Sequence, residues 1–228
     1  MPKFKNILVV ASHPDDEVLG CGGTLHKLKK EGAKISALFL SDGESSRKHP
    51  NIQKLINDRK KQAIKAGKVI GIKKIIFGNF PDNSMDTVPI LKVIQFIEKQ
   101  IKMIKPDTIF THFESDLNVD HQITSKAVIT ACRPIQNHTV RSILFFEVLS
   151  SSEWNISIKN KSFKPNYFVD IKKSIKYKLQ ALKFYKHEMR KWPHPRSTEG
   201  VKLLSKTRGS TVGLSNAEAF ILGRHIDK

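Results

Sequence analysis

Two short stretches of this sequence concentrate side chains that bind metals and carry protons. The first reads His13-Pro14-Asp15-Asp16-Glu17, with four ionisable groups in five residues directly after an apolar run. Carboxylates crowded in this way need a neutralising partner, and imidazole together with carboxylate is a normal ligand set for zinc. Because Pro14 stiffens the turn, we expect His13 and Asp16 to face one point while Asp15 faces elsewhere.

A helix cap is the structural alternative for this first stretch. Asp15 or Asp16 would cap the helix that follows, and acidic residues in its first turn would complement the helix dipole. Capping accounts for the aspartates but gives His13 no role. The first stretch by itself therefore leaves both interpretations open.

The second stretch covers residues 112–121 and adds two histidines and several carboxylates. A histidine ligand usually needs a partner for its other ring nitrogen, and Asp116 or Asp120 is close enough in sequence to be that partner. Capping of the next helix by Asp120 is again the alternative. Two histidines and one carboxylate leave a position for water, as in catalytic zinc sites, and a spare carboxylate beside that water acts as a general base. The residues indicate metal-assisted hydrolysis.

The elements that must position these stretches alternate between strand and helix over the first 150 residues. This alternation predicts an α/β fold, a Rossmann-like open and mostly parallel sheet with helices on both faces. Ligands of such sheets lie beyond the carboxyl ends of the strands, where both stretches fall. We expect strands at 5–11, 33–40, 73–77, 108–111 and 142–148, and helices at 17–30, 52–70, 88–104 and 121–131.

The alternation stops after Ser150. We expect an edge strand at 167–169, a helix at 171–187 and a Pro-rich loop at 192–196. The sequence therefore predicts a single domain over 1–228, with the α/β core in 1–150 and a C-terminal helical and loop extension in 151–228.

Composition excludes several classes of protein. The chain has 228 residues, 39% hydrophobic and 27% charged, which excludes collagen, coiled-coil, disulfide-scaffold and disordered chains. The apolar runs have the length of strands, so we expect no transmembrane segment. The first residues lack the apolar region of a signal peptide, and two cysteines, Cys21 and Cys132, make no disulfide framework. We therefore expect a reduced, cytoplasmic protein.

Charge is the extreme value in the composition, with 40 basic and 21 acidic residues and a formal net charge of +19. A field of this sign attracts nucleic acid, acidic lipid headgroups or phosphorylated metabolites, whereas dispersed lysines are also typical of a solvated surface. The sequence shows no helix-turn-helix, RRM-like or zinc-finger pattern, so we expect no specific nucleic-acid partner. A homo-oligomer is compatible with the sequence.

The motifs of this chain resemble those of a known enzyme family. Ala11 to Glu17, followed by Gly20-Cys21-Gly22-Gly23-Thr24, resembles the AHPDDE motif of the LmbE/PIG-L deacetylases, and Asp120-His121 matches their second motif. These are zinc-dependent enzymes that remove acetyl groups from N-acetylglucosamine-type sugars. The resemblance covers nearly the whole chain, continuing through residues 41–44, Pro81-Asp82 and 217–220.

The resemblance implies roles for individual residues. His13, Asp16 and His121 resemble the zinc ligands, and iron(II) accepts the same set. Asp15 resembles the base that deprotonates the attacking water and returns the proton to the sugar amine. The positions that align with substrate-contacting residues of the family are Glu44, Arg59 and Asp82.

The chain departs from the common family pattern at two positions. Many members have a histidine that stabilises the oxyanion where this chain has Asn118, whose amide can donate a hydrogen bond but cannot titrate. Gln62 stands where many members have a glutamate. We therefore count Asn118 and Asp120 with Asp15 among the catalytic candidates.

The Pro-rich loop adds two further candidates. His194 could supply the titratable donor that Asn118 lacks, and the guanidinium of Arg196 suits a substrate phosphate. A packed, Pro-stiffened connector is the alternative for this loop.

Together these observations predict a metal-dependent hydrolase that deacetylates an N-acetylated sugar or glycoconjugate, with a phosphate- or nucleotide-linked substrate suggested by the charge. A related amidohydrolase acting on a non-sugar amide is the first alternative. The second is a non-enzymatic anion- or nucleic-acid-binding protein, whose binding would depend on salt and not on metal.

Overall fold

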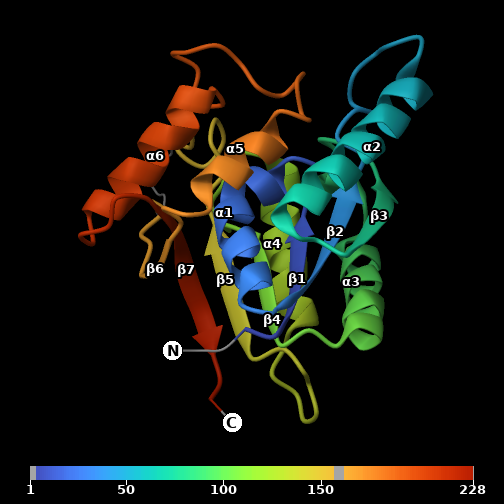
Figure 1. Ribbon diagram of the computed structural model, residues 1–228. Helices are drawn as coiled ribbons and strands as arrows, with labels where there is room; N and C mark the ends of the chain where they lie inside the picture. Colours follow the sequence, from blue (N-terminus) through green and yellow to red (C-terminus); the bar gives the residue numbers. More distant parts are fainter. Residues whose placement is uncertain (1–3, 157–161, 228) are drawn as a thin grey trace.

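A computed structural model describes residues 4–156 and 162–227 and shows a seven-stranded sheet in the order β3-β2-β1-β4-β5-β7-β6 (Figure 1). Neighbouring strands are parallel except at β7, which runs antiparallel to both β5 and β6. The strands are β1 (Asn6–Ala11), β2 (Lys34–Ser41), β3 (Lys74–Phe80), β4 (Thr108–His112), β5 (Ser142–Phe146), β6 (Tyr167–Asp170) and β7 (Ala217–His225).

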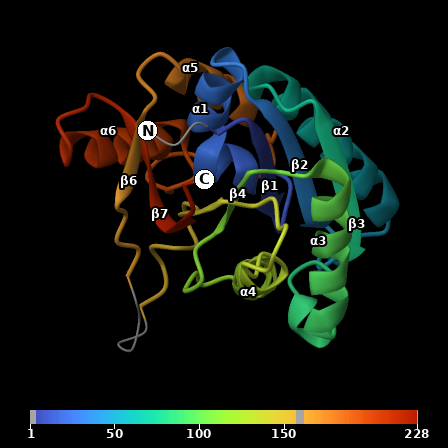
Figure 2. The ribbon, with the colours of Figure 1, turned by 90° about the horizontal axis from the view of Figure 1, so that it is seen from below.

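Helices cover both faces of the sheet, so the predicted Rossmann-like α/β fold is confirmed (Figure 2). One face carries α1 (Asp16–Lys30), α2 (Ile52–Ile70) and α5 (Ile175–Leu182), and the other carries α3 (Ile90–Ile104) and α4 (Val119–Ala131). Strand β1 alternates between the two apolar clusters, with Val9 in one and Val10 in the other. Both side chains are fully buried, as a parallel sheet between helical layers requires. Among the described residues no helix is long and apolar enough to cross a membrane.

The C-terminal residues add two strands to the sheet besides the helices and loops of the expected extension. The expected strand at 167–169 is β6 and lies at the sheet edge, but β7 and α6 (Thr198–Ser210) were not expected. Strand β7 carries a buried charge, Glu218, which pairs with Lys178 at 2.6 Å. The first four residues of β7 are all buried, so the strand lacks the alternation of apolar and polar residues that marks a half-exposed strand. The helix expected at 171–187 is only α5, because the chain turns after Leu182.

The carboxyl ends of β1, β2 and β4 bring together the loops that carry the candidate residues, at the upper edge of the sheet in Figure 1. Helix α1 packs closely against β5. The approach is so close that a Cβ at Gly20 would overlap the ring of Phe146. This close approach explains the glycine in the first motif and sets the position of Asp16 at the start of α1.

Candidate active site

Three predicted metal ligands converge at the edge of the sheet. His13 Nδ1 lies 3.3 Å from Asp16 Oδ2 and 3.4 Å from His121 Nε2, and His121 Nε2 lies 3.3 Å from Asp16 Oδ2. A tetrahedral zinc ion with bonds of about 2.0–2.1 Å separates its ligand atoms by about 3.3–3.4 Å. These atoms therefore have the spacing of one face of a zinc tetrahedron.

The charges around these atoms also fit a cation. Asp16, Asp82, Asp116 and Asp120 are all buried, and their ion-pair partners in the described part of the chain are histidines only. Asp16 Oδ1 is buried and has no hydrogen-bond partner. Burial opposes protonation of His121, yet the charge of Asp16 and contact with Asp116 raise the pKa of His121 to about 9. The four buried carboxylates therefore favour a positive charge at this site.

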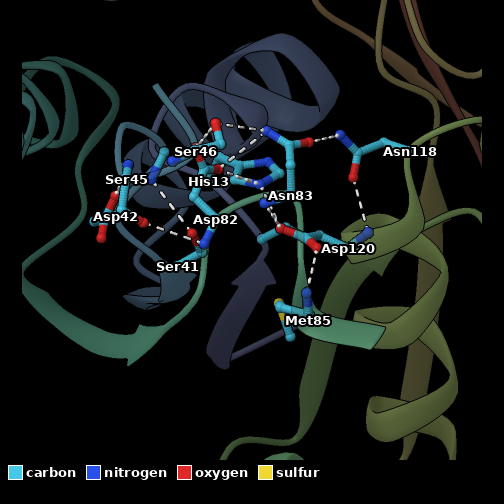
Figure 3. Close-up of polar contacts among 12 residues, drawn as sticks. His13, Ser41, Asp42, Ser45, Ser46, Asp82, Asn83, Met85, Asn118 and Asp120 are labelled. Atoms are coloured by element: carbon cyan, nitrogen blue, oxygen red, sulfur yellow. Dashed lines mark hydrogen bonds and ion pairs between the residues drawn. The ribbon is translucent and has the colours of Figure 1, made fainter. Parts of the chain in front are cut away.

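Carboxylates orient both candidate histidine ligands. His13 Nε2 lies 2.9 Å from Asp120 Oδ2 and 3.2 Å from Asp82 Oδ1, and Asp120 also accepts hydrogen bonds from the backbone of residues 83 and 85 (Figure 3). His121 Nδ1 lies 3.0 Å from Asp116 Oδ1. Such partners keep a ligating imidazole in the right tautomer and orientation. Asp120 and Asp82 thus contact a histidine, and the distances suit hydrogen bonds.

A third histidine, His112, supports the site, although the sequence analysis assigned it no role beyond membership of the second stretch. Its ring stacks on that of His121 with centroids 3.8 Å apart, and its Nε2 accepts a hydrogen bond from the Ser12 backbone at 2.9 Å. Burial lowers the pKa of His112 well below its usual range, so this ring is neutral near pH 7. Its position at the end of β4 was the only signal available in the sequence.

The Asp15 carboxylate is not part of the triangle of candidate metal ligands and contacts Arg196 instead, in line with the expectation that it faces another point than His13 and Asp16. This carboxylate lies 3.1 Å from Arg196 Nη1, and it makes no side-chain cap to α1. The Asp15 backbone has φ 130°, a conformation that side chains disfavour, and its N–H donates to Glu17 Oε2 at 2.9 Å. Burial raises the pKa of Asp15 to about 7 against the opposing charge of Arg196, which suits a general base.

Asn118 is the residue that caps α4. Its Oδ1 accepts hydrogen bonds from the backbone of Asp120 at 2.8 Å and of His121 at 3.3 Å. Its Nδ2 donates to Asn83 Oδ1 at 2.9 Å (Figure 3). Capping by Asp120 was therefore the wrong alternative, and the predicted donation by Asn118 to an oxyanion stays a prediction.

Beside Asp15 lies a second group of charges, which we call the arginine cluster. Arg59 donates from Nε to Glu44 at 2.9 Å and from Nη2 to Glu188, and Arg47 bridges the same two glutamates. Arg196 approaches Glu188 at 3.5 Å. The cluster contains three guanidiniums and three carboxylates, namely Arg47, Arg59, Arg196, Asp15, Glu44 and Glu188. Glu188 was not a candidate, because nothing local marks a residue that meets its partner 129 positions away.

His194 lies at the margin of this cluster. Its Nδ1 accepts the Arg196 backbone N–H at 3.0 Å, and its ring meets that of Trp154 edge-on with centroids 5.6 Å apart. In the described ranges no hydrogen bond or ion pair joins the side chain of His194 to Asp15 or to the candidate ligands. The proton-donor role of His194 stays a prediction.

Comparison with known proteins shows the family of this chain. Residues 8–132 match the family model PIG-L, GlcNAc-PI de-N-acetylase. The uncharacterized deacetylase YaiS of Escherichia coli is 31% identical over 81% of this chain and 92% of its own length. Diacetylchitobiose deacetylase of Thermococcus kodakarensis is 25% identical, over 81% of this chain and 70% of its own.

Solved structures share the fold. N,N'-diacetylchitobiose deacetylase from Pyrococcus horikoshii superposes with a TM-score of 0.78 at 22% identity, over 97% of this chain and 84% of its own. The 4-carboxy-2-hydroxymuconate hydratase GalB of Pseudomonas putida KT2440 also reaches 0.78, at 18% identity, over 98% of each chain. Fold and site together define an α/β protein of the deacetylase class. The chain belongs to the PIG-L family.

Proposed function

We propose that this protein is a zinc-dependent N-deacetylase that hydrolyses the acetamide of an N-acetylglucosamine-type sugar. The observation that carries the proposal is the triangle of His13 Nδ1, Asp16 Oδ2 and His121 Nε2 next to the buried carboxylate of Asp15. The family and the names of its deacetylase members support the same reaction.

The side chains divide the work of hydrolysis. His13, Asp16 and His121 would hold the ion, which when bound supplies a Lewis acid and lowers the pKa of water toward about 7. Asp15 accepts the proton of the attacking water and then donates it to the departing sugar amine. Its pKa of about 7 allows both transfers near neutral pH.

The surrounding groups keep the reacting ones in place. Asp120 and Asp116 hold the imidazole rings of His13 and His121, and Arg196 holds the carboxylate of Asp15. In this proposal Glu44 and Arg59 shape the substrate side of Asp15. Arg59 and Glu44 form an ion pair with each other, which holds both side chains in place.

The proposal also covers the metal and the compartment. Histidine and carboxylate ligands suit zinc, and iron(II) is the competing ion to be tested. Cys21 and Cys132 are both free and buried, which supports a reducing, cytoplasmic environment.

Metal analysis combined with a substrate panel tests this function. The purified protein is analysed for zinc and iron, and acetate release is measured with N-acetylglucosamine, diacetylchitobiose, UDP-N-acetylglucosamine and a non-sugar acetamide. We expect one equivalent of metal and metal-dependent acetate release from at least one of the sugars. Turnover of the non-sugar acetamide alone would contradict the sugar assignment, and chelator-resistant turnover would contradict the metal assignment.

A further inference from the structure

The proposed reaction leaves one chemical task without a residue. Attack on an acetamide develops negative charge on the carbonyl oxygen, and preorganised hydrogen-bond donors stabilise that charge. Asn118 uses its Oδ1 to cap α4 and one N–H of its Nδ2 for Asn83, which leaves one neutral N–H for this task. Both contacts lie on the Asp120 side of the site (Figure 3).

Arg196 offers a second donor, which is charged. Its Nε donates to the Leu149 carbonyl at 3.1 Å and its Nη1 to Asp15 Oδ2 at 3.1 Å, so two arms of the guanidinium are fixed. Its Nη2 donates to no described residue, and it is not among the fully buried polar atoms that lack a partner. Solvent therefore reaches this nitrogen.

The geometry of the guanidinium places this free donor close to the proposed base. The group is a planar fork, so Nη2 is the neighbour of the nitrogen that contacts Asp15. A substrate atom bound to Nη2 thus lies within a few ångströms of the Asp15 carboxylate. The guanidinium also stays charged at every relevant pH, so its donation does not depend on titration.

The other arginines of the cluster are less suitable. Arg59 uses Nε for Glu44, Nη1 for the Pro14 carbonyl and Nη2 for Glu188. Arg47 donates from both terminal nitrogens to glutamates, and its side chain is 46% exposed. Arg196 alone in the cluster combines contact with Asp15, 17% side-chain exposure and a terminal nitrogen without a protein partner.

We propose that Arg196 is a catalytic residue that donates a hydrogen bond from Nη2 to the carbonyl oxygen of the substrate acetamide, while its Nη1 holds Asp15. This inference rests on the proposed deacetylase function. It replaces the phosphate-binding role expected for Arg196 by a role in the chemical step. It also gives the C-terminal part of the chain a direct function in the reaction.

Steady-state kinetics on an uncharged N-acetylated sugar test the inference. For Arg196→Met we expect kcat to fall about 10²- to 10³-fold, as for loss of one oxyanion donor, with KM within about threefold of the wild type. Metal content stays at one equivalent. Free guanidinium at millimolar concentration restores part of the lost kcat, which a purely structural role would not allow at an unchanged melting temperature.

Two further variants keep the test decisive. Arg196→Lys retains the charge beside Asp15 and loses the fork, so it folds, keeps its metal and still shows a large loss of kcat. Arg208→Met is the matched control, because Arg208 is 23% exposed and donates to Glu147 at 2.7 and 2.6 Å. We expect the kcat of this control to equal that of the wild type.

The outcomes separate the inference from the proposed function. A raised KM with unchanged kcat in Arg196→Met and Arg196→Lys would show a role in ground-state binding and overturn the inference. Full kcat in both variants would overturn it as well. Absence of acetate release from every sugar by the metal-loaded wild type would overturn the proposed function and with it the role of Arg196.

Discussion

Two neighbouring residues, Asp15 and Asp16, belong to two different kinds of charged cluster. Asp16 belongs to a group of four carboxylates and three histidines, which we call the metal cluster: His13, His112, His121, Asp16, Asp82, Asp116 and Asp120. In the described residues no lysine or arginine pairs with these carboxylates. Asp15 lies in the arginine cluster, where three guanidiniums match three carboxylates. The metal cluster needs an added cation, whereas the arginine cluster is neutral as it stands.

This difference shows how one turn of chain serves two functions. Next to the positive φ of Asp15, adjacent carboxylates contact different partners: Asp16 belongs to the ligand triangle and Asp15 contacts Arg196. Lysine takes no part in either cluster: in the described chain the only ion pair of a buried lysine, Lys178 with Glu218, lies elsewhere. The two clusters should therefore respond differently to mutation, metal removal and salt.

Loss of a ligand from the metal cluster should have the largest effect. We expect His121→Ala, and equally His13→Ala, to lose stoichiometric metal and acetate release together, because neither loop alone supplies three ligands. Elemental analysis and the acetate assay measure both. His187→Ala, an exposed histidine, is the control and keeps its metal. Full metal occupancy in His121→Ala would contradict the ligand assignment.

Removing the charge of Asp15 should separate the clusters. In Asp15→Asn we expect metal to be retained and kcat to fall by about 10²- to 10⁴-fold, the usual contribution of a general base. The asparagine oxygen can still accept a hydrogen bond from Arg196. Metal analysis and kinetics are made on the same sample, and joint loss of metal and activity would place Asp15 in the metal cluster instead.

Loss of an arginine from the arginine cluster should lower the free energy of unfolding and leave the metal content largely unchanged. Arg59 is 2% exposed, and Arg59→Met leaves Glu44 and Glu188 without their main cation. We expect a loss of about 3–5 kcal/mol in the free energy of unfolding, measured by urea denaturation. Lys61→Met removes an exposed pair with Asp58 and should change stability by under about 1 kcal/mol. Equal stability of the two variants would contradict the role of Arg59.

Metal removal should make stability depend on pH through the metal cluster. In the metal-free protein the pKa of His121 is raised to about 9, so its protonated form stabilises the fold. That contribution is fully present below about pH 6.5 and is lost as the pH rises through 9. We expect the melting temperature of chelator-treated protein to fall between pH 6.5 and 9, more than that of the metal-loaded protein. Parallel pH profiles of the two forms would refute this.

Salt should produce the smallest effect. Because the arginine cluster is neutral in sum, kcat/KM for an uncharged sugar acetamide should change less than about twofold between low and physiological salt. With a phosphorylated substrate we expect a fall, since steering by the dispersed lysines is screened over about 8 Å. Salt-independent kinetics with that substrate would assign the net charge to solubility alone.

The fold by itself does not decide the reaction. A hydratase shares this architecture with a TM-score of 0.78, as deacetylases do. The ligand triangle and the placement of Asp15, which are properties of side chains, distinguish the proposed reaction.

The sequence by itself predicted the ligand triangle of the metal cluster and the α/β core, whereas the places of His112 and Asp82 in that cluster came from the structure. His13, Asp16 and His121 follow buried strands, and the carboxyl ends of parallel strands meet at one edge, so local pattern was enough to bring them together. The alternation of strands and helices likewise predicted the layers, because burial on both faces leaves a clear apolar signal in each strand.

Only the tertiary structure decided the arginine cluster, the insertion of β7 and the role of Asn118 as a cap. Arg196 meets Asp15 across 181 positions, and Glu188 meets Arg59 across 129. Ion pairs over such separations leave no periodicity in the sequence, because their geometry depends on how the C-terminal part folds back over α1. Residues that follow neighbouring strands, such as the ligand triangle, meet at one edge of the sheet, so their proximity can be predicted from the sequence. Residues of the arginine cluster meet only because a distant C-terminal segment packs against the N-terminal part, so their proximity is known only from the three-dimensional structure.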